Sequence, residues 1–195
     1  RFKMIAYKGF TKEMSAILGN GTYYFELGKK AVTEKSKTVS CGFHCCENPF
    51  ECLSYYRFDG NNRFFMVEVE GDIDEDGDER IAGTEITPLK ELSDKEFALA
   101  GMKYIIEHPA RMNWQQNYSE VKVCKDKADY KEARIVIVRG EDPEVITYIG
   151  QIVGMIKEKS GIITAAKLFE VKEKPGRYHL TDDRKIEEER SYEEK

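Results

Sequence analysis

A group of cysteines and a histidine offers the side chains best suited to metal or thiol chemistry. Four of the five cysteines and one of the three histidines lie within residues 41–52. Zinc binds thiolate and imidazole groups, so a zinc site is one interpretation of this stretch. Its ligands would come from Cys41, His44, Cys45, Cys46 and Cys52.

The spacing within this group leaves a second interpretation open. The common zinc frameworks use cysteines separated by two residues, which this stretch lacks, and the adjacent Cys45 and Cys46 do not easily face one ion. The alternative is that Cys45 and Cys52 are small core residues and that His44 hydrogen-bonds locally. A Cys/His nucleophile would need a third group to orient the base. None is evident, so we assign no catalytic residue and expect a non-enzymatic role.

An acidic stretch, residues 68–79, has eight carboxylates and no basic residue. Its pattern Asp72-x-Asp74-x-Asp76-Gly77 matches the first half of a calcium loop, but Gly83 stands where that loop has a bidentate glutamate. We therefore consider calcium or magnesium, held by Asp72, Asp74, Asp76 and Asp78. Repulsion among the carboxylates of a solvated hairpin loop is the second interpretation.

The third interpretation of the acidic stretch is a surface that binds a partner protein. An acidic surface can occupy a basic groove on another protein. The expected contact residues are Glu68, Glu70, Asp72, Asp74, Glu75, Asp76, Asp78, Glu79 and the single tryptophan, Trp114.

Short strands and helices are expected to position these residues. Asn48 and Pro49 predict the start of a helix, because asparagine caps a free backbone N–H and proline suits the first helical position. A strand should precede them, over residues 38–44. Residues 63–70 alternate between apolar and charged, which is typical of a strand with one buried face, and residues 80–89 should form the return strand.

Farther along, Ser93-Asp-Lys-Glu96 is a capping box that predicts the start of a second helix. That helix should end near His108-Pro109, because the residue before a proline avoids helical geometry. After residue 118 the chain is expected to be nearly all β, with strands over residues 121–124, 134–139, 149–157 and 162–171 and turns over residues 125–132 and 141–144.

These elements predict an α+β fold: a mixed antiparallel sheet with two short helices, followed by a β-rich C-terminal unit. The predicted boundaries are residues 1–112 for the α+β unit, residues 118–184 for the β-rich unit and residues 185–195 for a charged tail.

The composition limits the cellular compartment and the classes of partner that we expect for this protein. No apolar run is long enough to span a membrane, and the odd, clustered cysteines predict reduced thiols in a cytosol. The net charge of −5 argues against direct binding of nucleic acid, which requires lysine and arginine to displace counterions.

Several motifs together resemble an uncharacterised family found in phage and prophage genomes. The main one is Gly42-Phe-His-x-Cys-Glu-Asn-Pro-x-x-x-Leu-x-Tyr-Tyr56, accompanied by Tyr7-Lys-Gly-Phe10, Gly71-Asp-Ile-Asp-x-Asp-Gly-Asp78, Ala165-Ala-Lys-Leu-Phe-Glu-Val171 and Tyr178-His-Leu180. The resemblance implies a viral or prophage context, hence the cytoplasm of a bacterial host. It implies no activity, and this chain lacks the short Ala/Thr/Asn/Gly-rich repeats that many members carry.

Three functions are compatible with these features. The first is a phage accessory protein that binds a host protein, such as an inhibitor of a bacterial defence or nucleic-acid-handling system, through its acidic surface. The second is an enzyme of the ADP-ribosyltransferase type, because the order Tyr-Lys-Gly, Gly-Phe-His, Tyr-Tyr resembles the NAD-binding half of that fold. No arginine or histidine takes the expected place on the first strand, and no catalytic glutamate can be assigned. The third is a structural or assembly module that forms oligomers through its β-rich half.

Overall fold

The computed structural model describes residues 3–18, 21–33, 42–76, 80–110, 115–182 and 186–188. The chain divides into two compact units, residues 1–97 and 98–195. The boundary lies inside a helix, α1 (Asp94–Glu107), whose first turn belongs to unit 1 and whose remainder belongs to unit 2. The sequence analysis places this boundary later, near residue 112.

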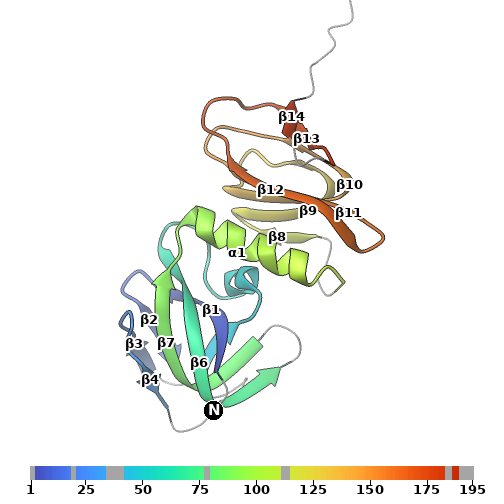
Figure 1. Ribbon diagram of the computed structural model, residues 1–195. Helices are drawn as coiled ribbons and strands as arrows, with labels where there is room; N and C mark the ends of the chain where they lie inside the picture. The colour runs from blue at the N-terminus through green and yellow to red at the C-terminus, as the bar shows by residue number, and fades with distance from the viewer. Residues whose placement is uncertain are drawn as a thin grey trace, which may run out of the picture. The chain divides into compact units, whose positions relative to one another are not determined.

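Unit 1 is built on an antiparallel sheet that closes on itself (Figure 1). Its elements are β1 (Lys3–Thr11), β2 (Ser15–Leu18), β3 (Gly21–Tyr24), β4 (Ala31–Val32), β5 (Phe43–Cys46), the 3₁₀ helix η1 (Pro49–Ser54), β6 (Asn62–Asp76) and β7 (Arg80–Glu91). The sheet order is β4-β7-β5-β1-β6, and β6 also pairs with β7. The strands β7, β5, β1 and β6 therefore form a closed ring, and β2 and β3 form a separate hairpin.

Alternation along β1 decides which of its side chains enter the core of unit 1. Ala6, Lys8 and Phe10 are buried and share one face, because successive side chains of a strand point to opposite sides. Phe10 packs against the rings of Phe25 and Phe65, with centroids 4.8 and 5.3 Å away. A lysine thus occupies a core position between two apolar neighbours.

A second aromatic group holds the first turn of α1 in unit 1. Phe97 lies with its ring centroid 5.5 Å from Phe50, 5.5 Å from Phe58 and 4.7 Å from Phe64. The capping box is confirmed: Ser93 Oγ accepts from the Glu96 amide and Glu96 Oε1 accepts from the Ser93 amide, both at 3.2 Å. The helix also ends immediately before His108, as the sequence predicts.

Unit 2 contains the rest of α1 and seven strands. These are β8 (Gln116–Tyr118), β9 (Val121–Asp129), β10 (Ile135–Ile146), β11 (Ile152–Lys159), β12 (Ile162–Glu170), β13 (Arg177–Leu180) and β14 (Ile186–Glu188). β9, β10 and β11 stack in parallel, and β8 and β12 pair antiparallel to the two outer members, β9 and β11.

The parallel strands of unit 2 form coils. Ile135 lies beside Val121 of β9 and beside Ile152 of β11. Parallel neighbours need a connection that returns the chain to the starting end, yet only residues 130–134 and 147–151 separate the strands. The strands themselves must therefore bend, and the β9–β10 pairing is interrupted between Arg139 and Glu144. Each strand and the connection after it therefore return the chain to a position beside the start of that strand.

The expected α+β class is wrong, because the described part of the chain is β-rich. It contains fourteen strands and only two helical segments, one of which is a 3₁₀ helix of six residues. Two stretches expected as turns lie largely or wholly in strands: residues 125–129 end β9, and residues 141–144 lie inside β10. Their polar side chains face outward from bent strands, which removes the apolar alternation that marks a strand in sequence. No helix among the described residues has the length and apolar character needed to cross a bilayer.

A buried ion pair lies in the interior of unit 2. Arg139 is fully buried, and its guanidinium donates from Nε and Nη2 to the two carboxylate oxygens of Glu158 at 3.2 and 3.1 Å. Nη2 also donates to the carbonyl of Pro109 at 3.3 Å. The paired geometry offsets the cost of removing both charges from water.

Arg139→Met should lower the free energy of unfolding by about 3–5 kcal/mol, because it leaves the Glu158 carboxylate buried without its partner. The double variant R139M/E158L should lose less than the single variant, since no unpaired charge remains. Arg177→Met is the matched control, because Arg177 pairs with Glu144 at the surface and such pairs contribute little. Urea unfolding measures all three, and equal losses for Arg139 and Arg177 would contradict this account.

Candidate functional site

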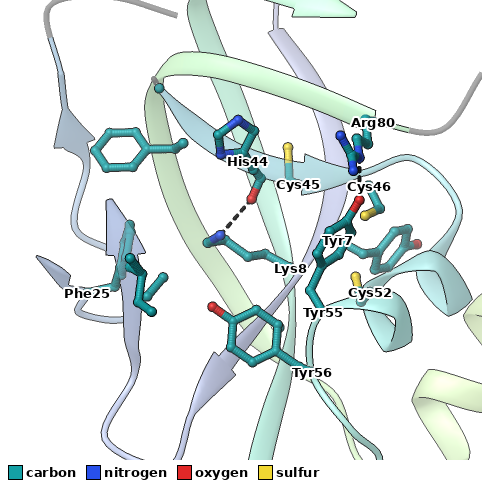
Figure 2. Close-up of a pocket in the computed structure, with 15 residues that line it drawn as sticks. Tyr7, Lys8, Phe25, His44, Cys45, Cys46, Cys52, Tyr55, Tyr56 and Arg80 are labelled. Atoms are coloured by element: carbon teal, nitrogen blue, oxygen red, sulfur yellow. Dashed lines mark hydrogen bonds between the residues drawn. The ribbon is translucent and has the colours of Figure 1, made fainter. Parts of the chain in front are cut away.

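A cavity of about 430 Å³ opens in unit 1 where β1 and β5 separate. Among the described residues the two strands pair only at Tyr7 and Cys46. Beyond that pair, residues 8–9 of β1 and 43–45 of β5 face each other without a backbone ladder and line the cavity instead. Figure 2 shows the side chains that surround this opening.

Lys8 projects into the opening from β1 (Figure 2). Its Nζ donates to the backbone carbonyl of His44 at 2.6 Å and lies 5.4 Å from the ring centroid of Phe10. The side chain is only 7% exposed. Burial disfavours the charged amine, so the pKa of Lys8 is lowered from its ordinary value. Lys8 therefore donates a hydrogen bond to a backbone carbonyl of β5 at a position where β1 and β5 do not pair.

Arg80 supplies the second basic group of the cavity. It begins β7, pairs in register with Cys46 of β5, and is exposed. Its guanidinium lies over the ring of Tyr55 at 5.2 Å and donates to the Tyr55 hydroxyl. A guanidinium keeps its charge at any ordinary pH, so the cavity has a permanent positive charge on its exposed side.

Three of the cysteines predicted to do chemistry line the same cavity. Cys45, Cys46 and Cys52 are all buried, and Cys45 Sγ donates to the carbonyl of Ile81 at 3.6 Å. Burial raises the pKa of Cys45 to about 12 and that of Cys52 well above its ordinary value. The thiolate is the reactive and metal-binding form, so burial keeps Cys45 and Cys52 in the less reactive thiol form at neutral pH.

The short helix η1 positions the aromatic wall of the cavity. Asn48 is fully buried and its Oδ1 accepts from the Phe50 amide at 3.1 Å, which confirms the predicted cap. The helix then leads into Tyr55 and Tyr56, both of which line the cavity. Tyr56 packs against Gly9, where an added Cβ would lie 2.6 Å from the tyrosine ring. Glycine at this position is what lets the ring approach β1.

The electrostatics of the cavity differ from those of the whole chain. The chain carries 36 acidic residues and a net charge of −5, yet none of the fifteen described residues that line the cavity is an aspartate or glutamate. The basic groups there are Lys8 and Arg80, with His44 as a third nitrogen-bearing side chain. A cavity of this kind attracts anions.

The predicted acidic site lies elsewhere in unit 1, on the hairpin formed by β6 and β7. The strands pair through this stretch as far as Asp76 and Arg80, so most of the expected loop is extended strand. Asp72 and Glu75 are exposed and Asp74 is partly buried. The structure describes only the backbone of Asp76, while Asp78, Glu79 and Trp114 lie outside the described residues, as does Cys41.

Two of the predicted contact residues already have basic partners within the unit. Glu70 is 3% exposed and lies 2.7 Å from the amine of Lys30, and Lys3 lies 3.5 Å from both Glu68 and Glu70. The hydrogen bond from Lys30 lowers the pKa of the Glu70 carboxyl. Basic side chains therefore partly neutralise the acidic stretch at its N-terminal end, at Glu68 and Glu70. Its carboxylates are most exposed near Asp72 and Glu75.

The described residues contain no group of three or more His, Cys, Asp or Glu side chains arranged to hold a metal ion. Of the five proposed zinc ligands, His44, Cys45, Cys46 and Cys52 are brought together around the cavity. Calcium or magnesium binding by Asp72, Asp74, Asp76 and Asp78 stays a prediction, since this set includes residues that the structure does not describe.

The sequence analysis missed the basic groups of the cavity. Lys8 could have been found from the alternation Ala6, Lys8, Phe10, which places a lysine on the apolar face of a strand. Arg80 has no comparable signal, because its place beside Tyr55 depends on the pairing of β7 with β5.

Between pH 8 and pH 10.5, the wild-type protein should lose about 2 kcal/mol more stability than Cys45→Ala. The unfolded thiol ionises near 9.0 while the folded thiol, with a pKa of about 12, does not, and one pKa unit corresponds to about 1.4 kcal/mol. This contribution is complete below pH 9 and declines above it. Urea unfolding at both pH values measures the difference, and parallel pH profiles for the two proteins would show that the Cys45 pKa is ordinary.

Comparison with curated proteins and with solved structures finds no match for this chain. Comparison with protein families does find a match, and it covers every residue that lines the cavity. Residues 4–100 are similar to the family described as a domain of unknown function (DUF7666).

Proposed function

We propose that the domain of residues 4–100 binds a small anionic molecule in the cavity between β1 and β5. The observation that carries this proposal is the lining: its described residues include the permanently charged Arg80 and the basic Lys8 but no carboxylate, although the chain as a whole is acidic. A bound anion would supply the counter-charge that Arg80 does not receive from the described lining residues. Arg80 would bind it by hydrogen bonds and charge, since guanidinium groups match carboxylate and phosphate oxygens.

The size and the aromatic lining support a ligand that also contains a planar ring. A volume of about 430 Å³ falls within the range of small-molecule sites. Tyr55 and Tyr56 follow η1 on one side, and Phe25 and Phe43 line another part of the cavity. Aromatic walls favour stacked or edge-on rings. A nucleotide combines such a ring with phosphate groups and is the ligand class that suits this lining.

NAD is the first nucleotide to test, because of the resemblance to ADP-ribosyltransferases. The three sequence pieces behind that resemblance, which include Gly9, His44 and Tyr56, all line the one cavity. Lys8 stands on the strand where such enzymes have arginine or histidine, and no catalytic glutamate is assigned. We therefore propose binding of a nucleotide without assigning a transfer reaction.

Millimolar NAD, ADP-ribose or AMP should raise the melting temperature of the protein, because a ligand that binds only the folded state stabilises it. Arg80→Gln should abolish the shift by removing the charge that holds the phosphate. Arg63→Gln is the matched control, since Arg63 is a surface arginine paired with Glu91 and does not line the cavity. Differential scanning fluorimetry measures the shift. The proposal fails if no member of the panel raises the melting temperature, or if R80Q and R63Q respond alike.

Binding of a host protein is the second candidate, favoured by the exposed carboxylates on the β6–β7 hairpin. Asp72 and Glu75 are exposed there and form no ion pair among the described residues, whereas Glu68 and Glu70 are paired with Lys3 and Lys30. The resemblance to phage and prophage proteins supports a bacterial host as the source of the partner, and a basic surface that normally contacts nucleic acid would complement the hairpin.

Asp72→Asn combined with Glu75→Gln should reduce the amount of host protein recovered with the tagged chain from a bacterial lysate at low salt. The reduction is expected because opposite charges speed and strengthen association at low ionic strength. Glu132→Gln, an exposed carboxylate of unit 2, is the control and should leave recovery unchanged. Equal recovery with the hairpin variant and the wild type would show that the hairpin is not the contact.

A further inference from the structure

The amine of Lys8 lies in an environment that differs from that of an ordinary surface lysine. It is on the buried face of β1, and among the described residues it forms no ion pair with a carboxylate. Its contacts are the His44 carbonyl at 2.6 Å and the face of Phe10 at 5.4 Å. A backbone carbonyl accepts a hydrogen bond from a neutral amine as well as from an ammonium, so this contact does not require the ammonium form.

Among the described residues, the titratable groups that act on Lys8 include no carboxylate. They are the thiols of Cys45, Cys46 and Cys52. With a pKa of about 12, Cys45 stays protonated at neutral pH, and the pKa of Cys52 is also well above its ordinary value. Burying an ammonium without a counter-ion costs more than burying the neutral amine, which is the physical cause of the lowered pKa of Lys8.

The neutral form of a lysine amine is a nucleophile, and a lowered pKa increases the fraction of Lys8 in that form. The Lys8 amine is also accessible from the cavity. Lys8 lines the same space as the exposed Arg80. A ligand whose anionic group contacts Arg80 would place another of its groups deeper, toward the amine. Desolvated lysines in apolar pockets react in this way with carbonyl compounds.

We propose that Lys8 forms an imine with the carbonyl group of a small anionic aldehyde or ketone whose charged group is held by Arg80. The step begins when the Nζ lone pair attacks the carbonyl carbon and forms a C–N bond. The carbonyl oxygen then leaves as water with the two amine protons, and a C=N bond remains. No oxidant or reductant takes part. The proposal rests on anion binding in this cavity and adds a covalent step and a substrate class.

Lys30 provides a matched comparison within unit 1. Its amine lies 2.7 Å from Glu70 and 3.0 Å from Glu85, and these carboxylates raise the pKa of Lys30. It is 41% exposed and therefore more accessible than Lys8, but it is held in the protonated, non-nucleophilic form. Selective reaction at Lys8 would therefore reflect protonation state rather than exposure.

Pyridoxal 5′-phosphate is a suitable probe, because it joins an aldehyde, a planar ring and a phosphate. The folded full-length chain is incubated with it at pH 7, reduced with borohydride and mapped by peptide mass spectrometry. Lys8 should carry the adduct at a level at least about tenfold above Lys30, since each pKa unit changes the neutral fraction of an amine tenfold. Lys8→Arg, which keeps a cationic side chain but cannot form an imine, should remove the adduct. Lys30→Arg should leave it, and Arg80→Gln should lower it.

Pyridoxine 5′-phosphate, the corresponding alcohol, separates the covalent step from anion binding. It should raise the melting temperature without forming a reducible adduct. If the alcohol and the aldehyde raise the melting temperature equally and no adduct maps to Lys8, the imine is overturned and anion binding stands. If neither compound shifts the melting temperature and the label spreads evenly over exposed lysines, both proposals fail. An adduct on Lys8 that Arg80→Gln leaves unchanged would overturn the role of Arg80 as the anion-binding group.

Discussion

The burial of one lysine amine between two separated strands is the constraint on which the site in unit 1 depends. β1 and β5 pair only at Tyr7 and Cys46, and Lys8 fills part of the opening beyond that pair. A buried backbone carbonyl needs a hydrogen-bond donor, and the Lys8 amine supplies one to His44. Among the described residues, no carboxylate pairs with the same amine. An anion or an electrophile that enters the opening would therefore interact with this amine more favourably than with a lysine at the surface.

The rest of unit 1 keeps the two strands apart while holding the unit closed. β6 and β7 complete the ring, so the sheet loses no stability from an open edge at this point. Phe10, Phe25 and Phe65 fill the interior below Lys8. The capped helix η1 brings Tyr55 and Tyr56 to the cavity. The ring of strands and η1 thus preserve a space that would close if β1 and β5 paired along their whole length.

Unit 2, by contrast, contains a buried charge that is paired with a carboxylate. Arg139 is enclosed with a bidentate carboxylate and a backbone carbonyl, so its charge is balanced inside the unit. Among the described residues, the Lys8 amine has no such carboxylate. A buried ion pair of the first kind is structural, because the two charges balance each other inside the unit. A buried basic group in a cavity, without its counter-ion, indicates a ligand site.

Sequence alone determined the features that depend on neighbours within four residues: the Asn48 cap, the Ser93–Glu96 capping box, the end of α1 and the alternation within β6. It also identified the cysteine stretch that lines the cavity, and it left open whether these thiols bind a metal or pack in the core. Only the tertiary structure decided that β6 and β7 close the sheet, that β1 and β5 separate, and that Lys8 and Arg80 share a cavity. The physical reason is that caps and alternation are local, whereas strand partners, gaps between strands and desolvation depend on residues far apart in the chain.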